Sequence, residues 1–114
     1  MIKRMSLLKR KPEMTSEQFD EHWLKIHGPM IAELPGLRHY VQNKPSEKVS
    51  GAAQIPVTDA GDQVDGITEL YFDSVEDMEA AYTSEQGQKC FADGQLFIGS
   101  ATTFTVTERI IKDW

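Results

Sequence analysis

Residues 19–40 read FDEHWLKIHGPMIAELPGLRHY, and this stretch decides the fold. Its apolar side chains recur every three or four residues, which is the spacing of one face of a helix. The residues on this face are Phe19, Trp23, Ile26 or His27, Met30 and Leu34. Upstream, Thr15 is followed three residues later by Gln18, the capping-box pattern that begins a helix. We therefore expect an amphipathic helix that begins at Thr15.

Prolines set where this helix ends. Pro29 has no backbone N–H and its ring clashes with the carbonyl of Lys25, so we expect the helix to kink or end near His27 and Gly28. Pro35-Gly36 is a turn signal, and Leu37 to Asn43, which follow it, form the second expected strand.

The rest of the chain supplies three more strands and a second helical region. Strand patterns cover Ile2 to Arg10, Ile67 to Phe72 and Ala101 to Ile111. Ser74 caps the second helical region, which we expect to break at Ser84 and Gly87 before a last helical piece with Cys90 and Phe91. The order β-α-β-β-α-β is that of the ferredoxin-like fold, an α+β fold with a four-stranded antiparallel sheet and helices on one face.

The length of 114 residues is enough for one domain, 1–114, with one core. Two helical regions cover only one face of the sheet, while the other face of the expected strands also carries Phe, Val, Tyr and Leu side chains. A second copy of the sheet would cover that face, because a twofold dimer uses the same patch twice. We therefore expect a homodimer.

Charge and composition exclude several classes of partner. Lysine and arginine number 12 and aspartate and glutamate 18, a net charge of −6, which argues against binding to nucleic acid or anionic lipid. No run of about 18 apolar residues is present to span a membrane, and the basic N-terminus lacks the apolar core of a secretory signal. The single cysteine, Cys90, permits no disulfide within the chain. We expect a cytoplasmic protein.

Residues 44–66, KPSEKVSGAAQIPVTDAGDQVDG, have no helical or strand period. A stretch of this length in a small domain is typical of a lid, a binding loop or an interface segment, and a plain surface loop is the alternative. We expect it at the rim of the dimer or over the mouth of the ligand cavity.

The sequence has no metal-binding or nucleotide-binding motif. Five positions separate His22 from His27, which places the two side chains about 140° apart on an α-helix, and the third histidine is His39. Neither HExxH nor a glycine-rich phosphate loop occurs. We therefore expect no metal and no cofactor.

Three positions carry polar groups suited to proton transfer. His27 lies on the apolar stripe at the expected kink, and an imidazole titrates near neutrality, so it is a candidate general acid or base. Tyr40 offers a phenol donor for an oxyanion or enolate. Glu69 is flanked by apolar residues in a strand, so if buried it must be paired or have a raised pKa. The alternatives are a buried histidine or tyrosine with one partner, a solvated edge carboxylate and, for Cys90, a small buried apolar residue.

The pieces Phe19, Trp23, His27-Gly28-Pro29, Leu34-Pro35-Gly36-Leu37 and Tyr40 together resemble the pattern of the EthD family. Phe72-Asp73-Ser74, Phe97 to Gly99 and Thr107-Glu108 resemble its second half, and the ITELYF strand and the FIG turn look like its methylmuconolactone isomerase type. The resemblance implies a dimeric α/β barrel, in which two sheets face each other around a ligand cavity, and it matches the helix histidine to His27 and the strand tyrosine to Tyr40. That type has a cysteine after Glu69, where this chain has Leu70.

Members of that family include cofactor-free isomerases of lactones, dehydratase-like or cyclase-like proteins and proteins tied to oxidative degradation. We therefore expect a cofactor-independent isomerase or lyase that acts on a small hydrophobic lactone or carbonyl compound from aromatic degradation. His27 would move a proton next to the carbonyl, Tyr40 would hydrogen-bond its oxygen, and Glu69 would orient or share a proton. The alternative is a non-catalytic small-molecule binding protein, or an accessory protein of an oxidative pathway. Haem-dependent or metal-dependent oxidation ranks last, because histidines are few and no ligands are paired.

Overall fold

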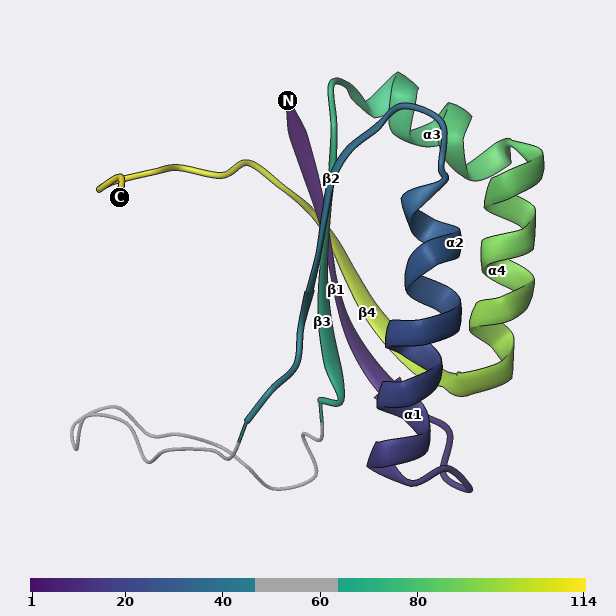
Figure 1. The fold of residues 1–114 in the computed structure, drawn as a ribbon. Helices are drawn as coiled ribbons and strands as arrows, with labels where there is room; N and C mark the ends of the chain where they lie inside the picture. The colour runs from purple at the N-terminus through teal and green to yellow at the C-terminus, as the bar shows by residue number, and fades with distance from the viewer. Residues whose placement is uncertain (47–63) are drawn as a thin grey trace, which may run out of the picture.

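The computed structural model describes residues 1–46 and 64–114, and these follow the expected order of elements (Figure 1). The elements are β1 (Ile2–Arg10), α1 (Ser16–His22), the π-helical turn η1 (Trp23–His27), α2 (Gly28–Ala32), β2 (Leu37–Asn43), β3 (Gly66–Phe72), α3 (Val75–Thr83), α4 (Glu85–Phe97) and β4 (Ile98–Val106). The expected ferredoxin-like fold is confirmed. Most of the 44–66 stretch lies outside the described residues, and so does the position that we expect for it.

The described strands form one antiparallel sheet in the order β2-β3-β1-β4. The helices all lie on one side of this sheet, with α4 beside α2 in the helical layer (Figure 1). Side chains of β3 therefore alternate between the two faces: Thr68, Leu70 and Phe72 are buried under the helices, whereas Glu69 and Tyr71 are only partly buried. The sheet thus has one covered face and one open face.

The last strand differs from its expected bounds at both ends. β4 covers Ile98–Val106, whereas the sequence pattern predicts Ala101 to Ile111. It begins earlier because Ile98 already pairs with Arg10 next to a bulge in the register. It ends earlier because Val106 pairs with Lys3, close to the start of β1, and a strand needs the backbone groups of a neighbour. Residues 107–114 therefore leave the sheet as a tail (Figure 1).

The second helical region breaks at one position, not two. Ser84 ends α3 and also caps α4, where its hydroxyl accepts a hydrogen bond from the N–H of Gly87 at 3.1 Å. Gly87 does not break the helix but lies in the first turn of α4, where a Cβ atom would collide with the Ala81 carbonyl oxygen. The missing side chain therefore lets the two helices meet closely. None of the described helices is long and apolar enough to cross a membrane.

The core lies between the sheet and the helices as two groups of buried side chains. One group is Leu8, Phe19, Trp23 and Phe97, and the other is Leu34, Leu70, Phe72, Met78, Ala81 and Cys90. The Phe19 ring packs against Trp23 and Phe97 with centroid distances of 5.7 and 5.2 Å, which joins α1 to α4. Ile26 is half exposed and His27 is buried, so the apolar stripe of the first helical region continues through His27.

Candidate active site

A π-helical turn brings two histidines to the same carboxylate. The N–H of Gly28 bonds to the carbonyl of Trp23, five residues earlier, so this turn holds one residue more than an α-helical turn. The expectation that His22 and His27 point to different faces is therefore wrong, because it assumes a regular α-helix between them. Both imidazoles contact Asp93 on α4. Single π-turns are frequent at functional sites.

His27 is buried, and one of its ring nitrogens is fixed. Nδ1 lies 2.8 Å from Asp93 Oδ2, while His22 Nε2 lies 3.0 and 3.1 Å from the two oxygens of the same carboxylate. Burial lowers the pKa of His27, the hydrogen bond to Asp93 opposes this shift, and the nearby His22 adds to it. His27 is therefore neutral near pH 7 and donates its Nδ1 hydrogen to Asp93. Its Nε2 has no hydrogen-bond partner among the described residues and can accept a proton.

The hydroxyl of Tyr40 is held by a neighbouring amide. Gln42 Nε2 donates to the Tyr40 hydroxyl oxygen at 2.8 Å and to the Trp23 carbonyl oxygen at 2.9 Å. Because the amide donates to the phenol oxygen, the phenol keeps its own hydrogen for a ligand. Burial raises the pKa of Tyr40, with Gln42 and Trp23 acting in the opposite direction. Tyr40 is therefore protonated at neutral pH and can act as a donor.

Gly28 leaves space for this arrangement. A Cβ atom at position 28 would lie 3.0 Å from Gln42 Nε2 and 3.2 Å from the Trp23 carbonyl oxygen, so it would crowd the amide that holds Tyr40. The helix expected to kink or end near His27 and Gly28 does not end there, because α2 begins at Gly28 directly after the π-turn and both residues have right-handed helical backbone angles. The absence of a side chain at position 28 thus leaves room for the Gln42 amide that holds the Tyr40 hydroxyl.

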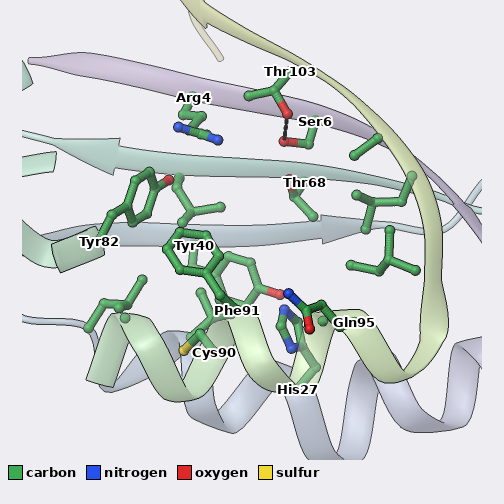
Figure 2. A pocket seen from close by; sticks show the side chains of 18 residues that line it. Arg4, Ser6, His27, Tyr40, Thr68, Tyr82, Cys90, Phe91, Gln95 and Thr103 are labelled. Atoms are coloured by element: carbon green, nitrogen blue, oxygen red, sulfur yellow. Dashed lines mark hydrogen bonds between the residues drawn. The ribbon is translucent and has the colours of Figure 1, made fainter. Parts of the chain in front are cut away.

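His27 and Tyr40 line one cavity of about 410 Å³ between the sheet and the helical layer (Figure 2). This volume is within the range of small-molecule sites. Apolar side chains make up much of its walls, among them Leu8, Ile31, Leu34, Leu70, Phe91 and Ile98. In Figure 2 the Tyr40 hydroxyl points toward the end of the cavity at which His27 and Gln95 lie. An acid–base group and a hydrogen-bond donor therefore face the same apolar space.

The described cavity lies within one chain, between the sheet and α4. The cavity that the family resemblance implies, between two facing sheets, requires a second copy of the chain and stays a prediction. The described cavity stays open because Thr68 and Thr103 on the sheet have short side chains and Gly94 on α4 has none, so the two layers do not fill it.

Glu69 is on the open face of the sheet and does not line this cavity. Its carboxylate accepts hydrogen bonds from Lys3 Nζ and from Asn43 Nδ2, both at 2.9 Å. The bond from Lys3, followed by that from Asn43, holds the pKa of Glu69 below its usual value. Lys3 Nζ also donates to Glu108 at 2.8 Å, and this bond chiefly raises the pKa of Lys3. Of the three candidate residues, the structure brings His27 and Tyr40 together and leaves Glu69 ionised and paired on the opposite face.

Sequence reasoning missed two residues of the site. Asp93 lies between Cys90 and Phe97 on the buried side of α4, so an acid on an apolar helical stripe was the signal that could have identified it. Gln42 faces the same side of β2 as Tyr40, but a glutamine in a strand gives no signal of its own. Cys90 is buried and lines the cavity, and burial raises the pKa of its thiol. Within the described residues, no group of three or more His, Cys, Asp or Glu side chains could hold a metal ion.

The chain is similar to several known proteins in sequence and in fold. The model of the EthD domain family matches residues 11–101. The 4-carboxymethyl-4-methylbutenolide mutase of Pseudomonas reinekei is 31% identical over 115 residues, which cover 97% of this chain and 100% of that protein. An EthD family protein from Bacillus halodurans has a similar structure, with a TM-score of 0.72, 24% identity, and coverage of 96% of this chain and 99% of that one. A dimeric ferredoxin-like protein of unknown function from Thermobifida fusca has a TM-score of 0.67 and 12% identity, over 94% of this chain and 90% of that one.

Proposed function

The chain belongs to the EthD family, and on that basis we propose that it is a cofactor-independent isomerase or lyase acting on a small lactone or related carbonyl compound. One observation carries the proposal: a neutral imidazole oriented by a carboxylate and a protonated phenol line the same cavity. The similarity to a butenolide mutase supports an isomerase. The proposed catalytic residues are His27 and Tyr40, with Asp93 as the positioning residue.

In the proposed reaction, His27 Nε2 removes a proton from the carbon next to the substrate carbonyl. The electrons of the broken C–H bond form an enolate, and the Tyr40 hydroxyl donates a hydrogen bond to its oxygen. In an isomerisation His27 returns the proton to a different carbon, so that the enzyme regains its neutral imidazole. In a lyase reaction the enolate instead expels a leaving group, which takes the proton. Asp93 stabilises the imidazolium between these steps.

Leu70 makes this cavity chemically different from that of the methylmuconolactone isomerase type. It lines the cavity at the position where the methylmuconolactone isomerase type has a cysteine. An alkyl side chain cannot serve as acid, base or nucleophile. We therefore propose that His27 and Tyr40 act without a thiol at this position, and that the substrate is a different lactone or carbonyl compound.

A homodimer through the open face of the sheet belongs to the same proposal. Phe104 on β4 is 50% exposed, and the tail carries exposed apolar side chains at Ile110, Ile111 and Trp114. The helices lie on the other face of the sheet (Figure 1). A twofold axis would bury these side chains against a second copy. The dimeric protein from Thermobifida fusca, which has the same fold, supports this arrangement.

The test is a screen of unsaturated lactones by ultraviolet absorbance with the purified protein and its Tyr40→Phe variant. We expect turnover of at least one lactone, and a fall of roughly 10²- to 10³-fold in the variant, the usual loss for one donor to an oxyanion. Saturable binding of these compounds without turnover would contradict the enzyme and favour the non-catalytic binding protein.

A further inference from the structure

We propose that Arg4 makes the cavity selective for substrates that carry a carboxylate, an inference that rests on the proposed function and names its substrate class. Arg4 lies on β1 and lines the cavity from the sheet. Among the described residues, it is the one permanently charged side chain in the lining, which contains neither aspartate nor glutamate. The cavity therefore has a positive charge in a chain whose net charge is −6.

The guanidinium of Arg4 has no ionic partner within residues 1–46 and 64–114. No described carboxylate forms an ion pair with it, and no described group makes a hydrogen bond to it. It lies over the Tyr82 ring, with Cζ 4.6 Å from the ring centroid, in a cation–π contact that leaves its N–H donors unused. Lys3, the preceding residue, faces the other side of the sheet and pairs with both Glu69 and Glu108. Of these two adjacent cations on β1, only Lys3 therefore forms an ion pair with a described carboxylate.

A carboxylate is the group that best fits this position. The planar guanidinium presents two parallel donors that match the two oxygens of a carboxylate, and such a pair is stronger in a partly buried, apolar cavity than in water. A phosphate dianion would leave one negative charge unmatched, because the described lining residues include no second permanent cation.

The position of Arg4 also fits a substrate with a carboxylate at one end and the reacting carbonyl at the other. In Figure 2 Arg4 lies near Tyr82, while His27 and Gln95 lie toward the other end of the cavity. A substrate whose carboxylate pairs with Arg4 would extend its carbonyl toward His27 and Tyr40. Arg4 would then act in binding and orientation, and His27 and Tyr40 in the chemistry.

The test compares a carboxymethyl-substituted butenolide with its methyl ester by calorimetry on the full chain. We expect the wild-type protein to bind the acid about 10- to 100-fold more tightly than the ester, because the acid gains charge-assisted hydrogen bonds. Arg4→Gln should remove this preference, so that the variant binds the acid and the ester with similar affinity. Arg4→Lys should retain part of the preference for the acid, because the positive charge remains but the two parallel guanidinium donors are lost. Arg38→Gln removes an equal charge at an exposed position of β2 and should retain the full preference.

Equal affinity for acid and ester in the wild-type protein, binding of neither, or a preference that survives Arg4→Gln would each overturn the inference. Melting temperatures of the two Arg4 variants show whether a lost preference for the acid results from unfolding. Arg4→Lys is the more conservative of the two, because it keeps a cation near the Tyr82 ring. The same measurements on His27→Asn separate this inference from the proposed function. A preference for the acid without turnover of any lactone would contradict catalysis only, and turnover of neutral lactones without the preference would contradict the role of Arg4 only.

Discussion

His27 Nδ1 and Asp93 Oδ2 lie 2.8 Å apart, although 66 positions separate the two residues in the chain. The contact joins the π-turn after α1 to the middle of α4, and Phe97 packs against the His27 ring with a centroid distance of 5.0 Å. The carboxylate fixes the tautomer of the imidazole, and the packing fixes its orientation. The site therefore depends on how two helical regions meet, and substitutions on α4 should affect the chemistry of His27.

Asp93→Asn should lower kcat by about 10²-fold or more with little change in KM, because the amide can no longer stabilise the imidazolium that forms during proton transfer. The contact with Asp93 raises the pKa of His27, so its loss should move the kinetic inflection of that group to lower pH. The measurement is a pH–rate profile of both proteins with a lactone identified by the screen.

His22→Gln is the control for that variant. It removes the other imidazole bound to Asp93 and leaves the bond between His27 and the carboxylate in place. We expect a much smaller loss of kcat than in Asp93→Asn. Equal losses in the two variants would mean that Asp93 acts through the packing of α4 and not through His27.

His27→Asn should lower turnover by roughly 10²- to 10⁴-fold, the usual loss for a general acid or base. The Asn amide nitrogen takes about the position of Nδ1, so the hydrogen bond to Asp93 can persist while Nε2 disappears. The melting temperature should therefore change little. Both quantities are measured on one preparation, and a destabilised but fully active variant would remove His27 from the proposed mechanism.

The same variant should change how stability depends on pH. Burial lowers the pKa of His27 from 6.5, so the folded state disfavours the charged ring despite Asp93, with His22 adding to the effect. The contribution of the neutral ring is fully present above the unfolded pKa and is lost as pH falls below it toward the folded pKa. In urea unfolding, the free energy of unfolding of the wild-type protein should fall relative to that of His27→Asn between about pH 7.5 and about pH 5. The exposed His39, replaced by Asn, is the control. A wild-type free energy of unfolding that rises relative to that of His27→Asn toward low pH would contradict the assigned neutral state.

The sequence predicts the fold well where a regular period or a cap marks an element. Thr15 with Gln18 and Ser74 with Asp77 begin helices as expected, since these side chains satisfy backbone donors locally. The end of β4 could not be predicted in this way, because it depends on where β1 stops pairing. The bounds of an edge strand are a property of two segments distant in sequence.

The candidate site could be predicted only in part, for a similar reason. His27 and Tyr40 stand out because each places a polar group in an apolar pattern, and both do line the cavity. Glu69 stands out equally, but side chains alternate between the two faces along β3, and Glu69 lies on the open face, where Lys3 pairs with it. The role of Asp93 requires the π-turn, and the extra residue of such a turn has no reliable signal in a single sequence.

Gly28→Ala tests the support of Tyr40. The added Cβ would meet Gln42 Nε2 at 3.0 Å and the Trp23 carbonyl oxygen at 3.2 Å, so the amide must shift away from Tyr40. We expect a loss of stability of about 1 to 3 kcal/mol in urea unfolding, the usual cost of overpacking, and a lower kcat. Gly94→Ala on α4 is the matched control for stability, since its Cβ meets only ordinary contacts at 3.7 and 3.9 Å and alanine favours a helix. A Gly28→Ala protein as stable and active as the wild type would show that the tight fit has no role.

Phe104→Asp tests the proposed homodimer separately from the site. Phe104 is half exposed on the open face of β4 and pairs with Met5, so its replacement should cost the isolated fold little. In a twofold dimer the change occurs twice, and each buried Phe side chain contributes about 1.5 to 3 kcal/mol. Sedimentation at micromolar concentration should therefore give a dimer for the wild type and for Leu96→Asp, an equal change on the helical side, but a 12.9 kDa monomer for Phe104→Asp. Because the cavity lies within one chain, monomeric Phe104→Asp should still bind the ligands of the wild type, and a wild-type monomer would contradict the dimer while leaving the His27 site intact.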